Sequence, residues 1–248
     1  KDGLRLIRGN SESTGFYNPH TIDTLYLTFS QPDYWTLLIN NFETKTDLVA
    51  KMVYRKAVYN DVGVRFKGEI SYRIVQGKKK SFNITLDYLH EDQNIEGYTT
   101  LNLNNAAEDR SRLREFLYEY FNRRHIPAVK ANFAILNING ENWGIYVNVQ
   151  QLNKPHAREW FTDADATRWR AEPIARTLPG ASGGNFGAGF SSINYLNTMD
   201  TTMYQKYYIL KNSYKKNPWD DLVKACYALN KTPTETLIDS LGKYMDID

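Results

Sequence analysis

Residues 62–82 read VGVRFKGEISYRIVQGKKKSF, and this stretch decides how the first half of the chain is interpreted. The alternating apolar and polar residues at its two ends predict a pair of β-strands. The polar segment between them, from Gly68 to Gly77, predicts a flexible loop. Six basic side chains lie in or beside that loop: Arg65, Lys67, Arg73, Lys78, Lys79 and Lys80. The cluster is either the solvated tip of a hairpin or an anion site, such as one for a phosphate held between two strands.

The composition excludes several classes of protein. The 248 residues suit one large domain or two small ones, and the net charge of +3 is too small to indicate nucleic acid binding. No stretch has the roughly 18 apolar residues of a membrane span. Cys226 is the only cysteine, so the chain forms no internal disulfide, and its apolar neighbours predict a small buried side chain. The 18 tyrosines, 11 phenylalanines and 5 tryptophans are a high aromatic content, typical of cores and of binding surfaces.

The order of predicted elements indicates an α+β protein. Strand-like segments run through residues 21–29 and 49–104, and Asn139-Gly140 predicts a hairpin between two further strands. The clearest amphipathic helix spans residues 109–124, with Leu113, Phe116, Leu117 and Tyr120 on one face. Later helices are predicted at 154–161, around 200–215, at 217–230 and at 233–245. We therefore divide the chain into a lead-in segment (1–22), a β-rich part (23–152) and a helical part (153–248).

A lysine on a strand and a glutamate on a helix are the residues most suggestive of chemistry. Lys80 shares one face of its predicted strand with the apolar Phe82, where a charged amine needs an anionic partner. Glu115 and Glu119 are four residues apart and lie on one face of the predicted helix 109–124. A strand lysine paired with a helix glutamate beneath a flexible loop is how protein kinases hold phosphates. The same pairing also occurs on surfaces for stability alone.

Other motifs argue against common alternatives. The segment GGNFGAG (183–189) lacks the Lys-Ser/Thr of a P-loop and follows no clear strand, which indicates a mobile loop or a turn that needs positive φ. The four histidines are far apart and lack zinc-site spacing. Among the carboxylate pairs, Asp246 and Asp248 are kept as candidates for metal binding or catalysis, with helix capping as the alternative.

Several segments, taken in order, resemble the spore-coat protein H (CotH) kinase family. They are VGVRFKGEISYR with KKSFNI, then GYTTLNLNNAAEDRSRLRE, then HIPAVKANFAILNINGENWGIYVNVQQLN. The resemblance implies an atypical protein-kinase-like fold with two lobes, a β-rich N-terminal lobe (23–152) and a helical C-terminal lobe (153–248). It also implies ATP, Mg²⁺ or Mn²⁺, and transfer of the γ-phosphate to Ser or Thr of extracellular or coat proteins. The expected location is extracellular or at a cell or spore surface, with further domains of a larger secreted protein as partners.

The resemblance implies roles for particular residues. Lys80, or Lys79, would hold the ATP phosphates, with Glu119 as its orienting partner and Glu115 second. The loop from Gly68 to Gly77 would cover them. The nucleotide-binding residues implied are Lys80, Lys79, Glu119, Arg65, Lys67, Ser71, Gln150 and Gln151, the last two at an adenine-binding hinge. The catalytic residues implied are Asp246 and Asp248, with Asp248 as a metal ligand.

Two alternatives to an active kinase remain open. In the family pattern the catalytic and metal-binding aspartates lie beyond YMDID, where this chain stops, so the helical lobe is expected to be incomplete. A CotH-like fold without the chemistry would be a surface adhesin or structural binding module. A carbohydrate-binding domain is the third interpretation; it rests on exposed Trp and Tyr side chains and would be favoured if Trp143, Trp160 and Trp169 lined one open face.

Overall fold

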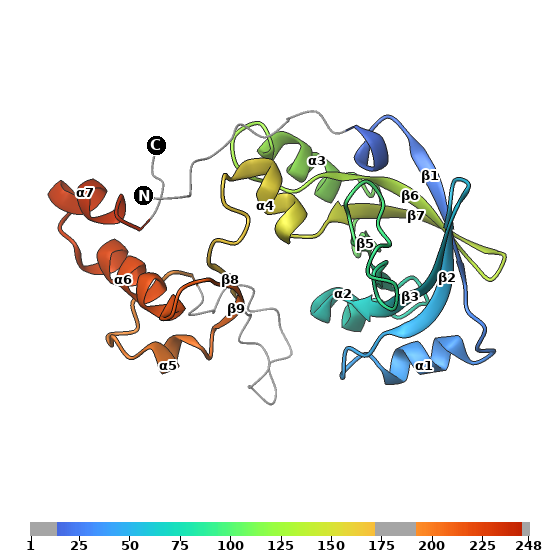
Figure 1. The fold of residues 1–248 in the computed structure, drawn as a ribbon, viewed down its shortest axis with the longest axis horizontal. Coiled ribbons are helices and arrows are strands. Elements are labelled where there is room, and N and C mark those ends of the chain that lie inside the picture. The colour runs from blue at the N-terminus through green and yellow to red at the C-terminus, as the bar shows by residue number, and fades with distance from the viewer. Residues whose placement is uncertain (1–13, 172–191, 245–248) are drawn as a thin grey trace. The chain divides into compact units, whose positions relative to one another are not determined.

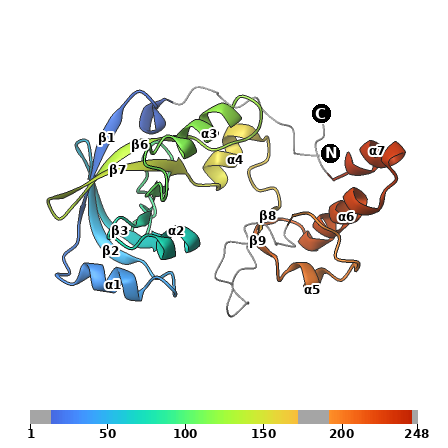
Figure 2. The ribbon, with the colours of Figure 1, turned by 180° about the vertical axis from the view of Figure 1, so that it is seen from behind.

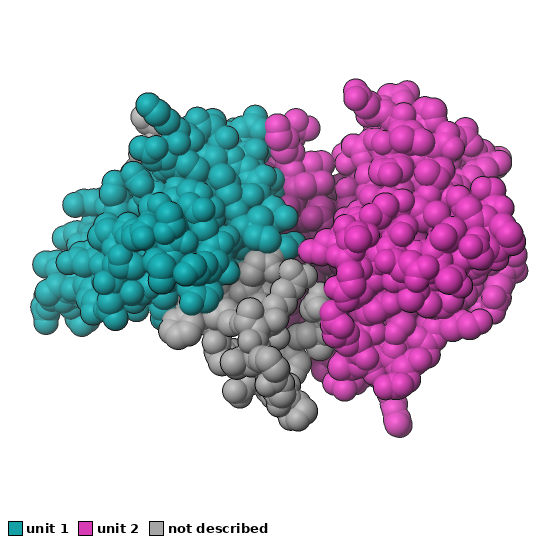
Figure 3. Space-filling view, turned by 90° about the horizontal axis from the view of Figure 1, so that it is seen from below, with its two compact units in different colours: residues 1–5, 161–248 teal, residues 6–160 magenta. Residues whose placement is uncertain are grey.

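The computed structural model describes residues 14–171 and 192–244, which form two compact units. In chain order, the first unit comprises residues 6–160 (magenta, labelled unit 2 in Figure 3) and the second comprises mainly residues 161–248 (teal, labelled unit 1). The candidate aspartates Asp246 and Asp248 and the segment GGNFGAG lie outside the described residues.

The first unit is a closed barrel of seven strands (Figures 1 and 2). The strands are β1 (Ile22–Thr28), β2 (Leu48–Tyr54), β3 (Ala57–Lys67), β4 (Ser81–Thr85), β5 (Thr100–Asn104), β6 (Ala131–Ile138) and β7 (Glu141–Gln150). Their order around the barrel is β1-β2-β3-β4-β5-β7-β6, and parallel pairing of β1 with β6 closes it. Neighbouring strands otherwise run antiparallel.

The predicted two-lobe kinase-like architecture is wrong. The sheet closes into a barrel, and the residues after Trp160 form a strand pair as well as short helices. Alternation of apolar residues in 22–28 predicts a strand, but periodicity does not reveal its partner. The partner is β6, far along the chain, and this long-range pairing turns an open sheet into a barrel.

Apolar side chains from alternate strand positions fill the barrel. Five of these side chains come from five different strands and are completely buried: Leu25, Val64, Phe82, Leu101 and Tyr146. Phe82 lies edge-on to Tyr146 and against Phe66, with ring centroids 6.0 and 5.2 Å away. Close packing of this kind fixes the strand ends, where the polar residues considered below are located.

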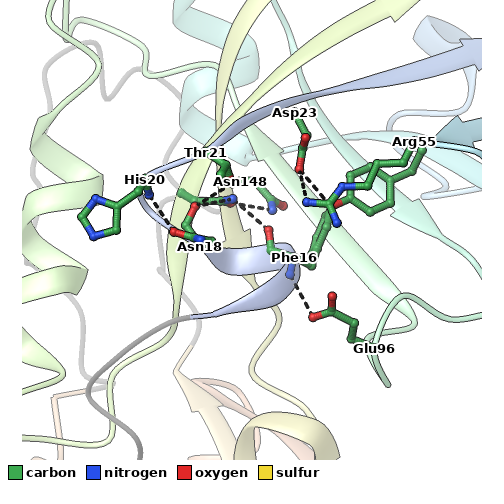
Figure 4. Close-up of polar contacts among 10 residues, drawn as sticks. Phe16, Asn18, His20, Thr21, Asp23, Arg55, Glu96 and Asn148 are labelled. Carbon is green, nitrogen blue, oxygen red and sulfur yellow. Dashed lines mark hydrogen bonds and ion pairs between the residues drawn. The ribbon is translucent and has the colours of Figure 1, made fainter.

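The start of the described chain is fastened across one end of the barrel (Figure 4). Phe16, in the 3₁₀ turn η1 (Gly15–Tyr17), makes two hydrogen bonds with its backbone. Its N–H donates to the Glu96 carboxylate at 2.8 Å, and its carbonyl oxygen accepts from Asn132 Nδ2 at 2.8 Å. Asn148 in turn donates to Asn132 at 2.9 Å. Because these amides are buried, their hydrogen bonds specify where the segment lies.

The Asn-Gly hairpin is confirmed, because β6 and β7 are joined at Asn139 and Gly140, whose φ angles are +50° and +86°. The loop after β3 is more ordered than predicted, since it contains helix α2 (Glu69–Ile74). Helix α1 (Tyr34–Asn40) lies beside β2 and β3, and α4 (Lys154–Trp160) follows β7 (Figure 1).

The predicted helix 109–124 is shorter in the structure. Helix α3 comprises Arg114–Asn122, because the residues before it turn at Ala106, Glu108 and Arg112, which all have positive φ. None of its side chains is fully buried, although Phe116 packs on Phe133 of β6 with ring centroids 5.0 Å apart. Most of its predicted apolar face is therefore exposed.

The second unit combines a two-stranded sheet with short helices. The elements are β8 (Arg168–Ala171), α5 (Thr201–Tyr204), β9 (Tyr208–Asn212), α6 (Pro218–Lys231), η2 (Thr234–Thr236) and α7 (Leu237–Leu241). The helix predicted around 200–215 is present only as the short α5, because β9 occupies the second half of that range, whereas the helix at 217–230 is confirmed as α6. Cys226 is buried as predicted, and burial raises the pKa of its thiol to about 11. Within the described ranges, no helix has the length and apolar character needed to cross a bilayer.

Candidate functional site

A polar cavity of about 360 Å³ lies where the ends of β3 and β5 meet the start of helix α3. It is called the polar cavity below. Its lining combines charged, hydroxyl and amide side chains with short backbone turns. The lining residues are Lys67, Gly68, Ser71, Ser81, Asn104, Asn105, Ala106, Ala107, Asp109, Arg114 and Glu115. Two basic and two acidic side chains converge on this one concave surface, which makes it a candidate site for a charged small molecule.

The centre of the polar cavity is a chain of three side chains. Lys67 Nζ donates to Asn104 Oδ1 at 3.0 Å, and Asn104 Nδ2 donates to Glu115 Oε1 at 2.6 Å. The last residue of β3 is thereby connected to the first turn of α3 through the last residue of β5. A strand lysine and a helix glutamate are brought together, as the sequence suggests, but they are Lys67 and Glu115.

Burial disfavours the charged forms of Lys67 and Glu115, the two ends of this hydrogen-bonded series. Burial lowers the pKa of Lys67 from 10.5 to about 8, although the Glu115 carboxylate opposes the shift. Burial likewise raises the pKa of Glu115, against the hydrogen bond from Asn104 and the charge of Lys67. Since the pair does not fully compensate the ammonium group, an anionic ligand in the cavity would stabilise the charged form of Lys67.

Lys67 gives the protein a specific dependence of stability on pH. Its native pKa lies below the unfolded value, so the cost of burying the ammonium is fully present below about pH 8 and is relieved as pH rises towards the unfolded value. We expect wild-type stability to gain about 1 to 2 kcal/mol from Lys67 between about pH 7.5 and pH 9.5, and Lys67→Met to lose that part of the gain. Urea unfolding at several pH values measures the difference, and identical pH slopes for the two proteins would contradict the assignment.

Capping residues order the turn that leads into α3. Asp109 accepts hydrogen bonds from the backbone N of Arg114 at 2.9 Å and from Ser111 Oγ at 2.6 Å, and these bonds lower the pKa of its carboxyl group. Asn105 N donates to Ser81 Oγ at 2.9 Å, and Asn105 Nδ2 donates to Lys79 O at 2.8 Å. The LNLNN stretch is thus tied to the start of β4, which gives the polar cavity a fixed wall.

Gly68 fixes the entrance to α2. Its φ angle is +82°, and a Cβ atom there would meet Ser71 Oγ at 2.3 Å. Replacing Gly68 by alanine should therefore destabilise the protein by about 1 to 2 kcal/mol, through backbone strain and displacement of Ser71. Gly77→Ala is the matched control, because a Cβ atom at Gly77 meets no atom within 4 Å and its φ is not positive. Equal stabilities of the two variants in urea unfolding would refute this explanation.

Lys79 and Lys80 have other partners than Lys67 does. Lys80 Nζ donates to the backbone oxygens of Tyr72 and Val75 at 2.8 and 2.5 Å, so it fastens the segment after α2. Lys79 Nζ donates to Trp143 O at 2.5 Å and lies 3.6 Å from the centroid of the Tyr146 ring. Burial, followed by the charge of Arg112, lowers the pKa of Lys79 to about 8. Neither lysine lines the polar cavity.

The remaining candidates have other partners. Arg65 forms a two-pronged ion pair with Asp47, at 2.8 and 2.9 Å, and Ser71 lines the polar cavity. Glu119 lies one turn after Glu115, and burial raises the pKa of its carboxyl group. At the predicted hinge, Gln150 joins Lys130 N to Glu159, whereas Gln151 accepts from Asn102 Nδ2 at 2.8 Å.

Sequence reasoning missed Asn104, Asn105, Asp109 and Arg114, which all line the polar cavity. A signal was present, because period-2 alternation in TTLNLN puts Asn102 and Asn104 on the same face of a strand, opposite its leucines. The tryptophans do not form one open face, since Trp160 is only 4% exposed and Trp143 packs on Trp35.

The described residues do not provide a complete metal site. Within residues 14–171 and 192–244, no group of three or more His, Cys, Asp or Glu side chains is placed to hold a metal ion. The polar cavity offers two carboxylates, Asp109 and Glu115, and the first of these caps α3. The donors therefore do not fit a divalent cation held by protein ligands alone.

Residues 64–248 match the family model described as CotH kinase protein. Because the match covers more than half of the chain, this protein belongs to the CotH kinase family, and the resemblance predicted from its sequence segments is confirmed. A search of curated proteins finds no match.

Proposed function

We propose that this chain binds ATP with its phosphates in the polar cavity and transfers the γ-phosphate to Ser or Thr of an extracellular or coat protein. Membership of the CotH kinase family supports the reaction class. The single observation that carries the proposal is the hydrogen-bonded series from the partly buried Lys67 through Asn104 to Glu115 in the polar cavity, where burial lowers the pKa of the ammonium group despite the Glu115 charge. Phosphate oxygens are strong acceptors for such a group, and the contact becomes stronger where water is excluded.

Four residues of the polar cavity have a defined part in this proposal. Lys67 donates to a phosphate oxygen with the hydrogens that Asn104 does not use, and Glu115 positions the amine through Asn104. The exposed Arg114 guanidinium at the start of α3 adds a second positive charge. Phosphoryl transfer depends mainly on this kind of positioning and charge stabilisation.

The family implies a divalent metal, Mg²⁺ or Mn²⁺, with ATP. The described carboxylates do not form a site for this metal. Asp246 and Asp248 stay predictions as metal-binding or catalytic residues. Nucleotide contacts of Lys80, Lys79, Arg65, Glu119, Gln150 and Gln151 stay predictions from the sequence, and the present proposal does not use them.

The proposal is tested by ligand-dependent thermal unfolding. ATP that binds the native state should raise the melting temperature by mass action, with or without Mg²⁺ or Mn²⁺, and adenosine should give a much smaller rise because it lacks the phosphates. Equal effects of ATP and adenosine would place the binding energy outside the polar cavity. No effect of millimolar ATP, with and without metal, would overturn the proposal for this chain.

A second candidate function, a surface-binding module without phosphotransfer, is favoured by helix α3. Its Leu117, Tyr118 and Phe121 side chains are 40%, 66% and 54% exposed, and apolar surface of this kind often marks a protein contact. A protein that gains no stability from ATP but retains its fold would favour this function.

A further inference from the structure

A second concave surface lies on the other side of the segment that follows β3. It is a groove of about 620 Å³ between α1 and residues 72–80, and it is called the basic groove below. Its lining residues are Trp35, Ile39, Tyr72, Arg73, Val75, Gln76, Gly77, Lys78 and Lys80. Ile39 is 44% exposed and Lys78 is also exposed, so the groove is open to solvent along its rim.

Two aromatic rings form a rigid floor in the basic groove. Trp35 stacks on Trp143 and lies against Phe66, with ring centroids 5.0 and 4.9 Å away. Tyr72 stacks on Phe42 with centroids 3.5 Å apart. Because neighbouring rings already hold Trp35 and Tyr72 in place, stacking of a ligand on them costs the protein little further side-chain entropy.

The charged residues that line the groove are all basic. Arg73, Lys78 and Lys80 line it, and none of its described lining residues is acidic. Lys80 is already bonded to the carbonyls of Tyr72 and Val75, which leaves one of its three hydrogens for a ligand. Arg73 pairs with Glu43 at 2.9 Å, and exposed pairs of this kind are weak enough for an incoming carboxylate to join or replace.

We propose that the basic groove binds an acidic peptide segment in which an aromatic side chain is flanked by carboxylates. The aromatic side chain would stack on Trp35 and Tyr72, and the carboxylates would face Lys78, Arg73 and Lys80. A peptide fits better than a nucleic acid, because the groove offers one short aromatic floor instead of a basic stripe with repeated stacking positions. The inference rests on the proposed function in one respect: the peptide belongs to the phosphoacceptor protein, which the groove holds beside the polar cavity.

Both concave surfaces share the segment from Gly68 to Lys80 as a wall. Gly68 and Ser71 line the polar cavity, and the next residues, Tyr72 and Arg73, line the basic groove. A peptide bound in the groove would therefore contact the same segment, α2 and the residues after it, that borders the proposed phosphate site.

The experiment uses fluorescence anisotropy with a short fluorescein-labelled peptide in which glutamates flank a single tryptophan. The wild-type chain should bind this peptide without ATP, and binding should weaken as salt is added. A peptide with lysines in place of the glutamates should not bind, and one with serine in place of the tryptophan should bind about tenfold more weakly. Equal affinity for the tryptophan and serine peptides would overturn the proposal.

Matched charge reversals separate the groove from general attraction. Lys78→Glu should weaken binding of the acidic peptide by about tenfold or more, since it replaces an attraction by a repulsion. Lys51→Glu makes the same charge change on β2, at an exposed residue that does not line the groove, and should leave the dissociation constant within about twofold. Equal losses in the two variants would show non-specific attraction and contradict the inference.

Thermal unfolding of the same samples with ATP distinguishes this inference from the proposed function. If ATP raises the melting temperature but the peptide does not bind, the docking groove is refuted and the nucleotide proposal is left intact. If the peptide binds but ATP does not change the melting temperature, the docking proposal is supported and the phosphotransfer proposal is refuted. Displacement of the peptide by ATP would mean that the groove is itself the nucleotide site, which overturns the inference.

Discussion

Replacing Lys67 by methionine is expected to remove most of the rise in melting temperature that ATP gives the wild-type protein. Methionine keeps the length of the side chain but cannot donate to a phosphate oxygen. A charge-assisted hydrogen bond of this kind contributes about 1.5 to 3 kcal/mol, so the dissociation constant for ATP should rise by about tenfold to a hundredfold. Differential scanning fluorimetry over a series of ATP concentrations measures the loss.

Lys78→Met is the matched control for this variant. It removes the same charge from the basic stretch between Arg65 and Lys80, but at an exposed residue that does not line the polar cavity. The ATP-dependent rise should survive in the control. If both variants lose it equally, the basic cluster binds ATP only through its overall charge.

Replacing Glu159 by glutamine is expected to cost about 3 kcal/mol of stability, the largest loss foreseen for a single polar side chain. Glu159 Oε1 accepts from Tyr98 Oη, Lys130 Nζ and Gln150 Nε2 at 2.8, 3.1 and 3.0 Å. The Lys130 side chain is only 13% exposed, so the substitution removes a carboxylate from a mostly buried ammonium group. Breaking a buried pair in this way costs about 3 to 5 kcal/mol.

Glu43→Gln breaks a comparable pair at the surface. Glu43 and Arg73 are 2.9 Å apart, but their side chains are 67% and 55% exposed, so the loss should be below about 1 kcal/mol. Chemical unfolding of both variants tests the contrast. Similar losses would mean that the Glu159 cluster is not what fastens α4 to the barrel.

Local signals in the sequence predict local structure well. Asn139 and Gly140 adopt the positive φ angles that their hairpin requires, and Pro218 marks the start of α6. The closed barrel was not predictable in the same way, because it depends on the parallel pairing of β1 with β6. Residues 200–215 show the opposite problem, since tertiary packing of Tyr208 overrides the helical pattern.

The candidate site was predictable in kind but not in detail. A strand lysine and a residue of helix α3 were expected to meet, and Lys67 and Glu115 do meet through Asn104. Three lysines in succession at 78–80 drew attention to Lys80, but its amine turns back to the carbonyls of its own loop. Which lysine faces the cavity depends on where α2 ends and β4 begins, and a polar loop carries no periodicity that fixes this.

Calorimetric titration of ATP into Lys67→Met and Lys80→Met, side by side with the wild-type chain, tests the central claim most directly. Binding of the phosphates in the polar cavity predicts that Lys67→Met loses about tenfold or more in affinity. Lys80→Met should remain within about twofold of wild type, because Lys80 does not line that cavity. The reverse order, with affinity lost only in Lys80→Met, would contradict the account and place the phosphates in the basic groove.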